Sequence, residues 1–180
     1  MQLDPSQSAS VRLYALVTFH QDKRAAAFLG FCRFLWLEPK GPKSAEAYAN
    51  MQHILKGGTL KPEAGVPAPH SDASNLALNK AIGMAAAATS KRKYTGAGEE
   101  FSEQLPAIFT AIGEVAQKQS GSDFFYTHLA PVFYRMAQTS YAPVFARVIT
   151  QGTDSTATAW VNNHPQLIKK LDDWTKANNL

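Results

Sequence analysis

Apolar residues recur at helical spacing through most of the chain. Side chains three and four positions apart share one face of a helix, so this spacing predicts amphipathic helices. No stretch alternates apolar and polar residues between hairpin turns, as a half-buried strand would. The clearest stripe predicts a helix over about residues 99–119, and it consists of Phe101, Leu105, Ile108, Ile112 and Val115.

Residues 23–37 are apolar on so many sides that a helix there should lie at the centre of the core. The chain contains 28 alanines against 8 valines and 6 isoleucines. Because alanine favours helices and β-branched residues favour strands, this composition supports a helical fold. We predict an all-α protein, an irregular bundle of helical hairpins with about seven to nine helices.

Capping residues and helix breakers predict where the helices begin and end. Ser44 and Asp72 are expected N-caps, and Gly57 suits the left-handed conformation that ends many helices. Pro131 should kink the helix that contains it. We expect a flexible tail at residues 1–8, one helical domain at 9–180 and a long proline-containing loop at 57–72. The predicted helices cover residues 9–21, 23–37, 44–57, 72–89, 99–119, 122–139, 143–150, 155–161 and 165–176.

Composition excludes several classes of protein. The chain has 180 residues, 18% of them charged and 45% hydrophobic, which is unlike a disordered chain or a coiled-coil rod. Cys32 is the only cysteine, so a disulfide framework within the chain and a multi-cysteine metal site are excluded. The longest apolar run, residues 25–32, is too short to span a bilayer.

Residues 1–10 hold no cation and no apolar core of a signal peptide. As the sequence stands, the expected location is the cytoplasm. The alternative is a periplasmic or secreted protein from which a signal segment has been removed.

The formal net charge is +4, which only mildly favours an acidic partner. The one dense basic run, Lys91, Arg92 and Lys93, is followed by Tyr94 and precedes an expected helix N-terminus. It is the candidate anion-binding site, and it supports one alternative function, weak binding of an anion or nucleic acid. Glu99 and Glu100 oppose that interpretation, since they are typical first-turn acids.

Catalytic patterns are absent. No two of the five histidines have the spacing of a helical metal site, so no metal and no cofactor are expected. Cys32 lies in the most apolar helix, where burial should raise its pKa and keep it unreactive. A helical enzyme or small-ligand carrier using dispersed residues such as His53, His128 and Arg135 remains an alternative function.

Surplus aromatic residues are the strongest candidate for a binding surface. Phe124, Phe125 and Tyr126 are consecutive, so one helix cannot bury all three on one face. Exposed aromatic residues beside arginine are typical interface anchors. The alternative is a thick core in which later helices cover both sides. The predicted partner-binding residues are Phe124, Tyr126, Tyr134, Arg135, Tyr141 and Arg147.

Two segments twelve residues apart share the pattern A-P-V-F-x-R, at 130–135 and 142–147. This distance is too short for a solenoid repeat. The pattern indicates either one reused way of starting or bending a helix, or a pair of arginines offered to an anionic partner.

Ala27, Phe31 and Pro39 follow an earlier expected helix that contains Leu13 and Tyr14. With the exit Leu37-Glu38-Pro39, this segment resembles the second half of a tetratricopeptide repeat, although the aromatic and glycine marks of the first half are missing. The resemblance covers about 35 residues. It implies a helical surface that binds another protein.

Together, the absent chemistry, the helical-hairpin resemblance and the aromatic surplus predict a non-enzymatic protein–protein interaction domain, such as an adaptor, inhibitor or immunity-type protein. Another protein is therefore the expected partner, rather than nucleic acid.

Overall fold

The computed structural model describes residues 6–58, 72–89 and 93–180. Within these residues the fold consists of helices with no strand, which confirms the predicted all-α class. Nine α-helices and one π-helical turn are present in the described part of the chain. In order they are α1 (Ser8–His20), α2 (Arg24–Leu37), α3 (Pro42–Leu55), α4 (Ala73–Thr89), α5 (Ala97–Ala116), η1 (Phe125–Leu129), α6 (Ala130–Ala137), α7 (Tyr141–Thr150), α8 (Ser155–Asn163) and α9 (Pro165–Ala177).

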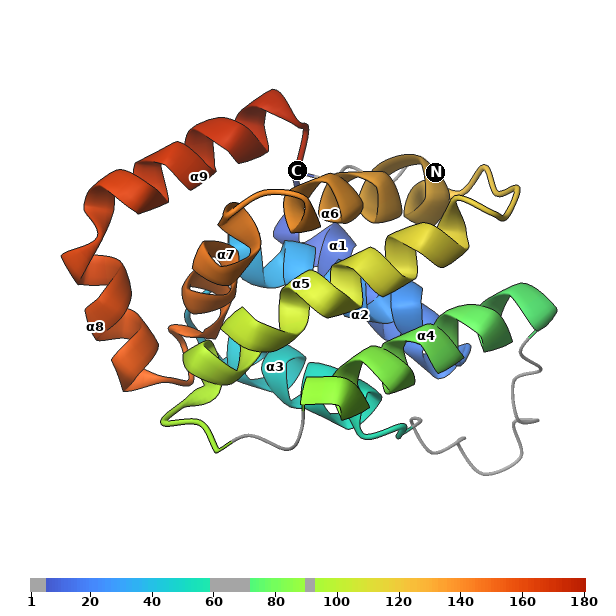
Figure 1. The fold of residues 1–180 in the computed structure, drawn as a ribbon, viewed down its shortest axis with the longest axis horizontal. Helices are drawn as coiled ribbons and strands as arrows, with labels where there is room; N and C mark the ends of the chain where they lie inside the picture. The colour runs from blue at the N-terminus through green and yellow to red at the C-terminus, as the bar shows by residue number, and fades with distance from the viewer. Residues whose placement is uncertain (1–5, 59–71, 90–92) are drawn as a thin grey trace.

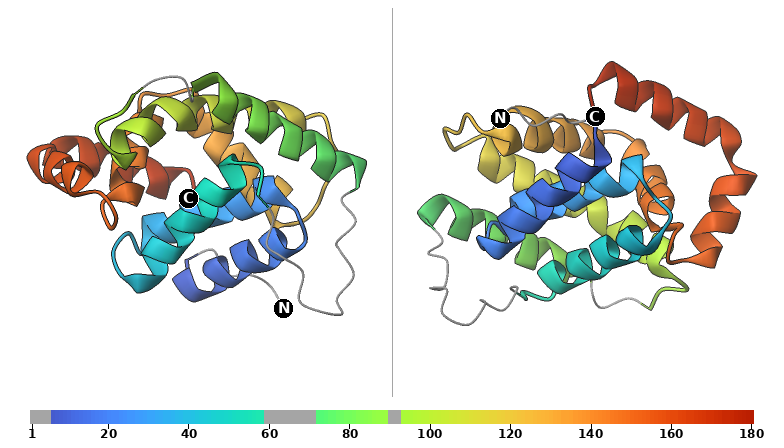
Figure 2. Two further views of the ribbon diagram at one scale, coloured as in Figure 1. Left: turned by 90° about the horizontal axis from the view of Figure 1, so that it is seen from below. Right: turned by 180° about the vertical axis from the view of Figure 1, so that it is seen from behind.

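Helix α2 lies at the centre of the molecule, as its apolar sequence predicts. Every residue from Ala25 to Leu35 is buried. Helix α1 packs behind it and α5 crosses in front of it (Figures 1 and 2). A Cβ added to Gly30 would lie 3.0 Å from the Cβ of Ala15, so glycine permits the close crossing of α1 and α2.

Helix α5 is the longest of the described helices and the second organising element. The predicted stripe is confirmed, since Phe101, Leu105, Ile108 and Ile112 are fully buried. The helix packs against α4, α6 and α7, and it runs diagonally across the front of Figure 1. It continues through Pro106, which the apolar pattern did not mark as a break.

Pro131 lies just after a π-helical turn, within one uninterrupted helical run over residues 124–137. Residues 125–129 form η1, in which the amide of Ala130 donates to the carbonyl of Phe125 five residues back. Pro131 then occupies the first turn of α6. The predicted helix over 122–139 is therefore present as a continuous run over 124–137, in which the register changes from π in η1 to α in α6.

Three predicted helix ends have different outcomes. Asp72 does cap α4, because its Oδ1 accepts from the amide of Asn75 at 2.8 Å. Gly57, at φ +75°, ends α3 as predicted, with the amide of Gly58 donating to the carbonyl of His53. The cap predicted at Ser44 is wrong, since α3 already begins at Pro42; Ser44 is buried and its Oγ donates to the carbonyl of Glu38 at 2.6 Å.

Helices α8 and α9 form an arm that curves around α7 at one side of the molecule (Figure 1). Within α8, only Ala157 is fully buried. No helix in the described part of the chain is both long enough and apolar enough to cross a membrane. Most of the predicted loop at 57–72 and of the tail at 1–8 lies outside the described residues.

Candidate functional site

The aromatic triplet at 124–126 meets three different environments, because consecutive residues of a helical segment point in different directions. Phe125 is buried in the core, with 2% of its surface exposed. Phe124 is half-buried and lies edge-on to Tyr14 of α1, with the ring centroids 5.2 Å apart. Tyr126 is half-buried and its hydroxyl donates to Oε1 of Gln119 at 2.7 Å. The segment thus both meets another element and leaves aromatic surface accessible.

Tyr126 borders two cavities. The smaller one, which we call the arginine cavity, has a volume of about 170 Å³ and lies between α5, η1 and α6. The predicted residues Tyr134 and Arg135 line it together with Tyr126. Arg135 is exposed and donates to Asn178, at 3.2 Å to the side-chain oxygen and 3.4 Å to the backbone oxygen. Three of the six predicted partner-binding residues therefore meet at one place.

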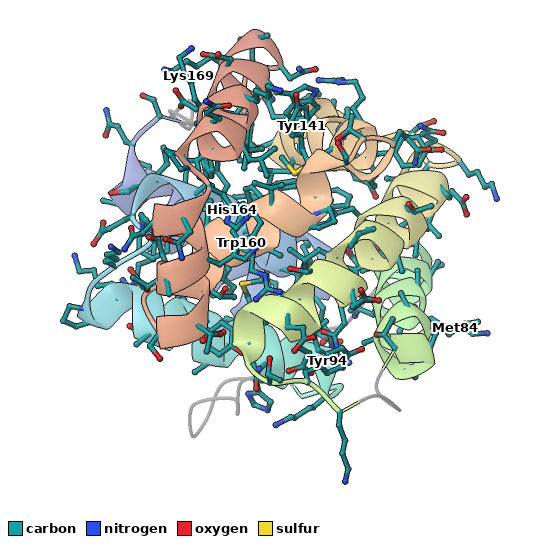
Figure 3. The ribbon with its side chains drawn as sticks, turned by 60° about the vertical axis from the view of Figure 1, so that its left-hand side comes forward. Met84, Tyr94, Tyr141, Trp160, His164 and Lys169 are labelled. Carbon is teal, nitrogen blue, oxygen red and sulfur yellow. The ribbon has the colours of Figure 1, made fainter. Side chains whose placement is uncertain are left out.

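The other predicted residues lie elsewhere. Tyr141 packs against Trp174 of α9, with the ring centroids 6.0 Å apart. The guanidinium of Arg147 lies 5.8 Å from the ring centroid of Trp160 in α8. His164 stacks on the same tryptophan at 4.1 Å, and Figure 3 shows the two rings beside each other in the α8–α9 arm. The shared A-P-V-F-x-R pattern thus starts α6 and continues through the first turns of α7, but its two arginines contact different helices.

The larger cavity beside Tyr126, which we call the acidic cavity, has a volume of about 360 Å³. It opens between α1, the N-terminal ends of α2 and α4, and the segment before η1. Its wall includes three aromatic rings and two carboxylates. These are the rings of Tyr14, Phe125 and Tyr126 and the carboxylates of Asp72 and Asp123.

Each carboxylate uses one oxygen to hold the local backbone. Oδ1 of Asp72 accepts from Asn75, and Oδ1 of Asp123 accepts from the amide of Tyr126 at 3.2 Å. In both residues Oδ2 makes none of the hydrogen bonds found among the described residues. The cavity therefore presents negative charge next to aromatic faces.

Two tyrosines of the cavity wall have raised pKa values, and the carboxylates contribute to both shifts. Burial, and then the carboxylate of Asp123, raise the pKa of Tyr14 above its usual value. The pKa of Tyr126 is also raised, first by burial and then by Asp123 and Asp72. With raised pKa values, both hydroxyls stay neutral at physiological pH. Lys23 is the one cation among the described residues that line the cavity.

Two exposed aliphatic residues of α1 lie at and beside the acidic cavity. Leu13 and Val17 lie one turn apart on α1, so their side chains share a face. They are 62% and 44% exposed, and Val17 lines the cavity. They add exposed apolar surface beside the cavity.

The predicted anion site cannot be assembled from the described residues, since Lys91 and Arg92 lie outside them. Lys93 is exposed, and the hydroxyl of Tyr94 donates to the carbonyl of Thr89 at 2.9 Å. His53 and His128 are both exposed, and His128 stacks on Phe124. Nowhere in the described ranges do three histidine, cysteine or acidic side chains gather as metal ligands would.

Sequence reasoning missed most of the acidic cavity. Asp72 was recognised as a helix cap, and Asp123 and Tyr14 carried no functional prediction. These residues come from three segments far apart in the chain, and no local spacing connects them. Only the exposed aliphatic pair on α1 offers a sequence signal, and it resembles many helix surfaces.

Comparison of the chain with models of protein families, with curated proteins and with solved structures found no match.

Proposed function

We propose that this protein is a non-enzymatic protein-binding domain, of the adaptor, inhibitor or immunity type, that takes a basic side chain of its partner into the acidic cavity. The observation that carries the proposal is the pairing of Asp72 and Asp123 with the rings of Tyr14, Phe125 and Tyr126 in one cavity. Carboxylates attract a cation, and aromatic faces stabilise it further through their quadrupoles.

Charge complementarity selects the occupant. Two carboxylates against the single Lys23 leave the described wall with a net negative charge, although the whole chain is positive. A lysine or arginine side chain would extend its aliphatic stem along Val17 and Leu78, and its cationic end would reach the carboxylates. A partner segment with a basic residue beside apolar ones fits this surface.

The surroundings favour a macromolecular partner over a free small cation. Leu13 and Val17 continue the apolar surface beyond the cavity along α1. Across Tyr126, the arginine cavity supplies the opposite charge through Arg135. Two cavities of opposite charge on one tyrosine would set the orientation of a bound segment, because the reversed segment would meet like charges.

The direct test is titration of isotope-labelled protein with N-acetyl-arginine amide, followed by two-dimensional NMR. We expect shifts of amides at residues 120–126 and of α1. N-acetyl-glutamine amide, which has no charge, should leave these signals in place. A wild-type spectrum that responds equally to both compounds would contradict the proposed charge selection.

The matched variant is the double substitution Asp72→Asn and Asp123→Asn. Asparagine keeps the oxygen that accepts from Asn75 or Tyr126, so the backbone remains held while the charge is removed. At about 0.2–1 kcal/mol for each exposed charge pair, loss of both should lower the affinity about two- to thirtyfold. The control removes two charges from α9 with Asp172→Asn and Asp173→Asn, and it should bind as the wild type does.

The same three proteins should then be used as bait in lysate of the source organism. A partner retained by the wild type and the α9 control, and lost by the cavity variant, would support the proposal. A partner retained equally by all three would place the interface elsewhere.

A further inference from the structure

A third cavity, separate from the proposed protein-binding site, lies between the end of α3, the middle of α4 and the start of α5. Its volume is about 350 Å³, near the lower end of the range for small-molecule sites, which is roughly 300–1,000 Å³. We call it the glutamine cavity. Its described lining residues are Gln52, Leu55, Lys56, Gly83, Ala86, Ala87, Glu100 and Gln104.

Gln104 gives the first sign of a ligand-binding site. Its side chain lines the cavity and is only 4% exposed. The amide nitrogen donates to Oε1 of Glu100 at 3.1 Å, but the amide oxygen has no hydrogen-bond partner among the described residues. A buried acceptor without a donor is unfavourable and rare in folded proteins. A ligand that brings an N–H group into the cavity would remove this cost.

The charged residues of the cavity narrow the chemistry of that ligand. Glu100 supplies a carboxylate next to the Gln104 amide, and the two together suit an ammonium group. Lys56 follows the last residue of α3 and supplies an ammonium that suits a carboxylate. The negative charge of Glu100 also contributes, after burial, to a pKa of about 12 for the nearby Tyr48.

Apart from Gln52, the rest of the described wall is apolar, and α4 contributes only small residues to it. Leu55, Ala86 and Ala87 offer contact to an aliphatic group. Gly83 lines the cavity and is exposed, and a Cβ added there would meet no atom of the described residues within 4 Å. A large side chain at this position would therefore narrow the cavity where it opens to solvent.

We propose that the glutamine cavity binds a free amino acid with an aliphatic side chain. In this arrangement Glu100 and Gln104 accept from the ligand's ammonium group, Lys56 binds its carboxylate, and the aliphatic group contacts Leu55 and the alanines of α4. This site goes beyond the proposed protein binding. The glutamine cavity shares no lining residue with the acidic cavity, so either proposal can fail without the other.

Isothermal titration of the full chain with L-leucine and L-valine tests the proposal. Two comparison compounds each lack one charged group of leucine: 4-methylpentanoate has no ammonium, and 3-methylbutylamine has no carboxylate. We expect at least one of the two amino acids to bind, and both comparison compounds to bind at least tenfold more weakly. Failure of both amino acids to bind at millimolar concentration would overturn the proposal, as would equal binding of the amine.

Two variants locate the binding. Gln104→Met keeps the length of the side chain and removes the acceptor, so affinity should fall about ten- to a hundredfold. Gly83→Leu places a large side chain at the opening of the cavity and should weaken binding. Leucine is a better helix former than glycine, so this variant should melt no lower than the wild type.

Gln166→Met on α9 is the matched control, because Gln166 is exposed and distant from the cavity in sequence. It should bind as the wild type does. Unchanged binding in both Gln104→Met and Gly83→Leu would overturn the assignment to this cavity.

Discussion

Asp154 joins the N-terminal ends of two helices that are far apart in the sequence. Its Oδ2 accepts from the amide of Gly98 in α5 at 2.7 Å. Its Oδ1 accepts from the amide and the hydroxyl of Thr156 in α8, at 2.8 and 2.7 Å. Only 8% of the residue is exposed, so water replaces these bonds poorly. We predict that Asp154→Ala destabilises the protein far more than loss of an ordinary surface carboxylate.

The magnitude follows from the two functions of the side chain. Loss of an N-cap costs about 0.5–2 kcal/mol. Loss of the charged hydrogen bond to Gly98 costs about 1.5–3 kcal/mol. Since the N-termini keep some access to water, we expect a total near the middle of the summed range, about 3 kcal/mol. For a chain of this size the melting temperature should fall by about 6–12 °C.

Urea denaturation followed by circular dichroism measures this change in the free energy of unfolding. Hydrogen exchange should locate it, because α8 contributes only Ala157 to the buried core and should open first. Asp173→Ala is the control: its carboxylate is exposed and pairs with Lys169 at 3.1 Å, so its loss should cost less than about 1 kcal/mol.

The pH dependence gives a second, independent result. Burial alone would raise the pKa of Asp154, but the hydrogen bonds from Gly98, Thr156 and Ala157 outweigh it and hold the pKa below its usual value. Stability from a carboxylate with a lowered pKa is complete above the unfolded-state pKa, about 3.9, and disappears as the pH falls through the folded-state pKa. The stability difference between wild type and Asp154→Asn should therefore stay constant from pH 7 to 5 and shrink below about pH 4.

Two results would refute this reasoning. One is a loss below about 1 kcal/mol in Asp154→Ala at pH 7, which would mean that water replaces both caps. The other is a difference between wild type and Asp154→Asn that does not shrink in acid.

Two further predictions concern the core. Phe145→Ala should lower the free energy of unfolding by about 3–5 kcal/mol, because its fully buried ring packs against Phe133, Phe109 and Trp36; a loss below about 2 kcal/mol in urea denaturation would contradict this packing. Cys32 is fully buried and burial raises its pKa, so a thiol reagent should modify it only at the rate at which the protein opens. Rapid modification of the native protein, seen in an absorbance assay with an aromatic disulfide, would contradict that burial.

The sequence by itself determined the helices and most of their ends. The stripe through Phe101 and Leu105 predicted α5, Asp72 predicted the start of α4, and Gly57 predicted the end of α3. These features depend on interactions within a few residues. They are apolar side chains on one face of a helix, a local N-cap and a left-handed backbone angle. Such information is present in any short segment of the chain.

Packing decided what each side chain contacts. Arg135 and Arg147 occupy the same place in a shared pattern, yet one donates to Asn178 and the other lies over Trp160. Ser44 has the residue type of a cap but bonds to the preceding turn, because Pro42 already starts α3. The acidic cavity joins Tyr14 to Asp123, and the glutamine cavity joins Lys56 to Gln104. No periodicity links residues so far apart, since their distance depends on the crossing of whole helices, and the tertiary structure alone sets that crossing.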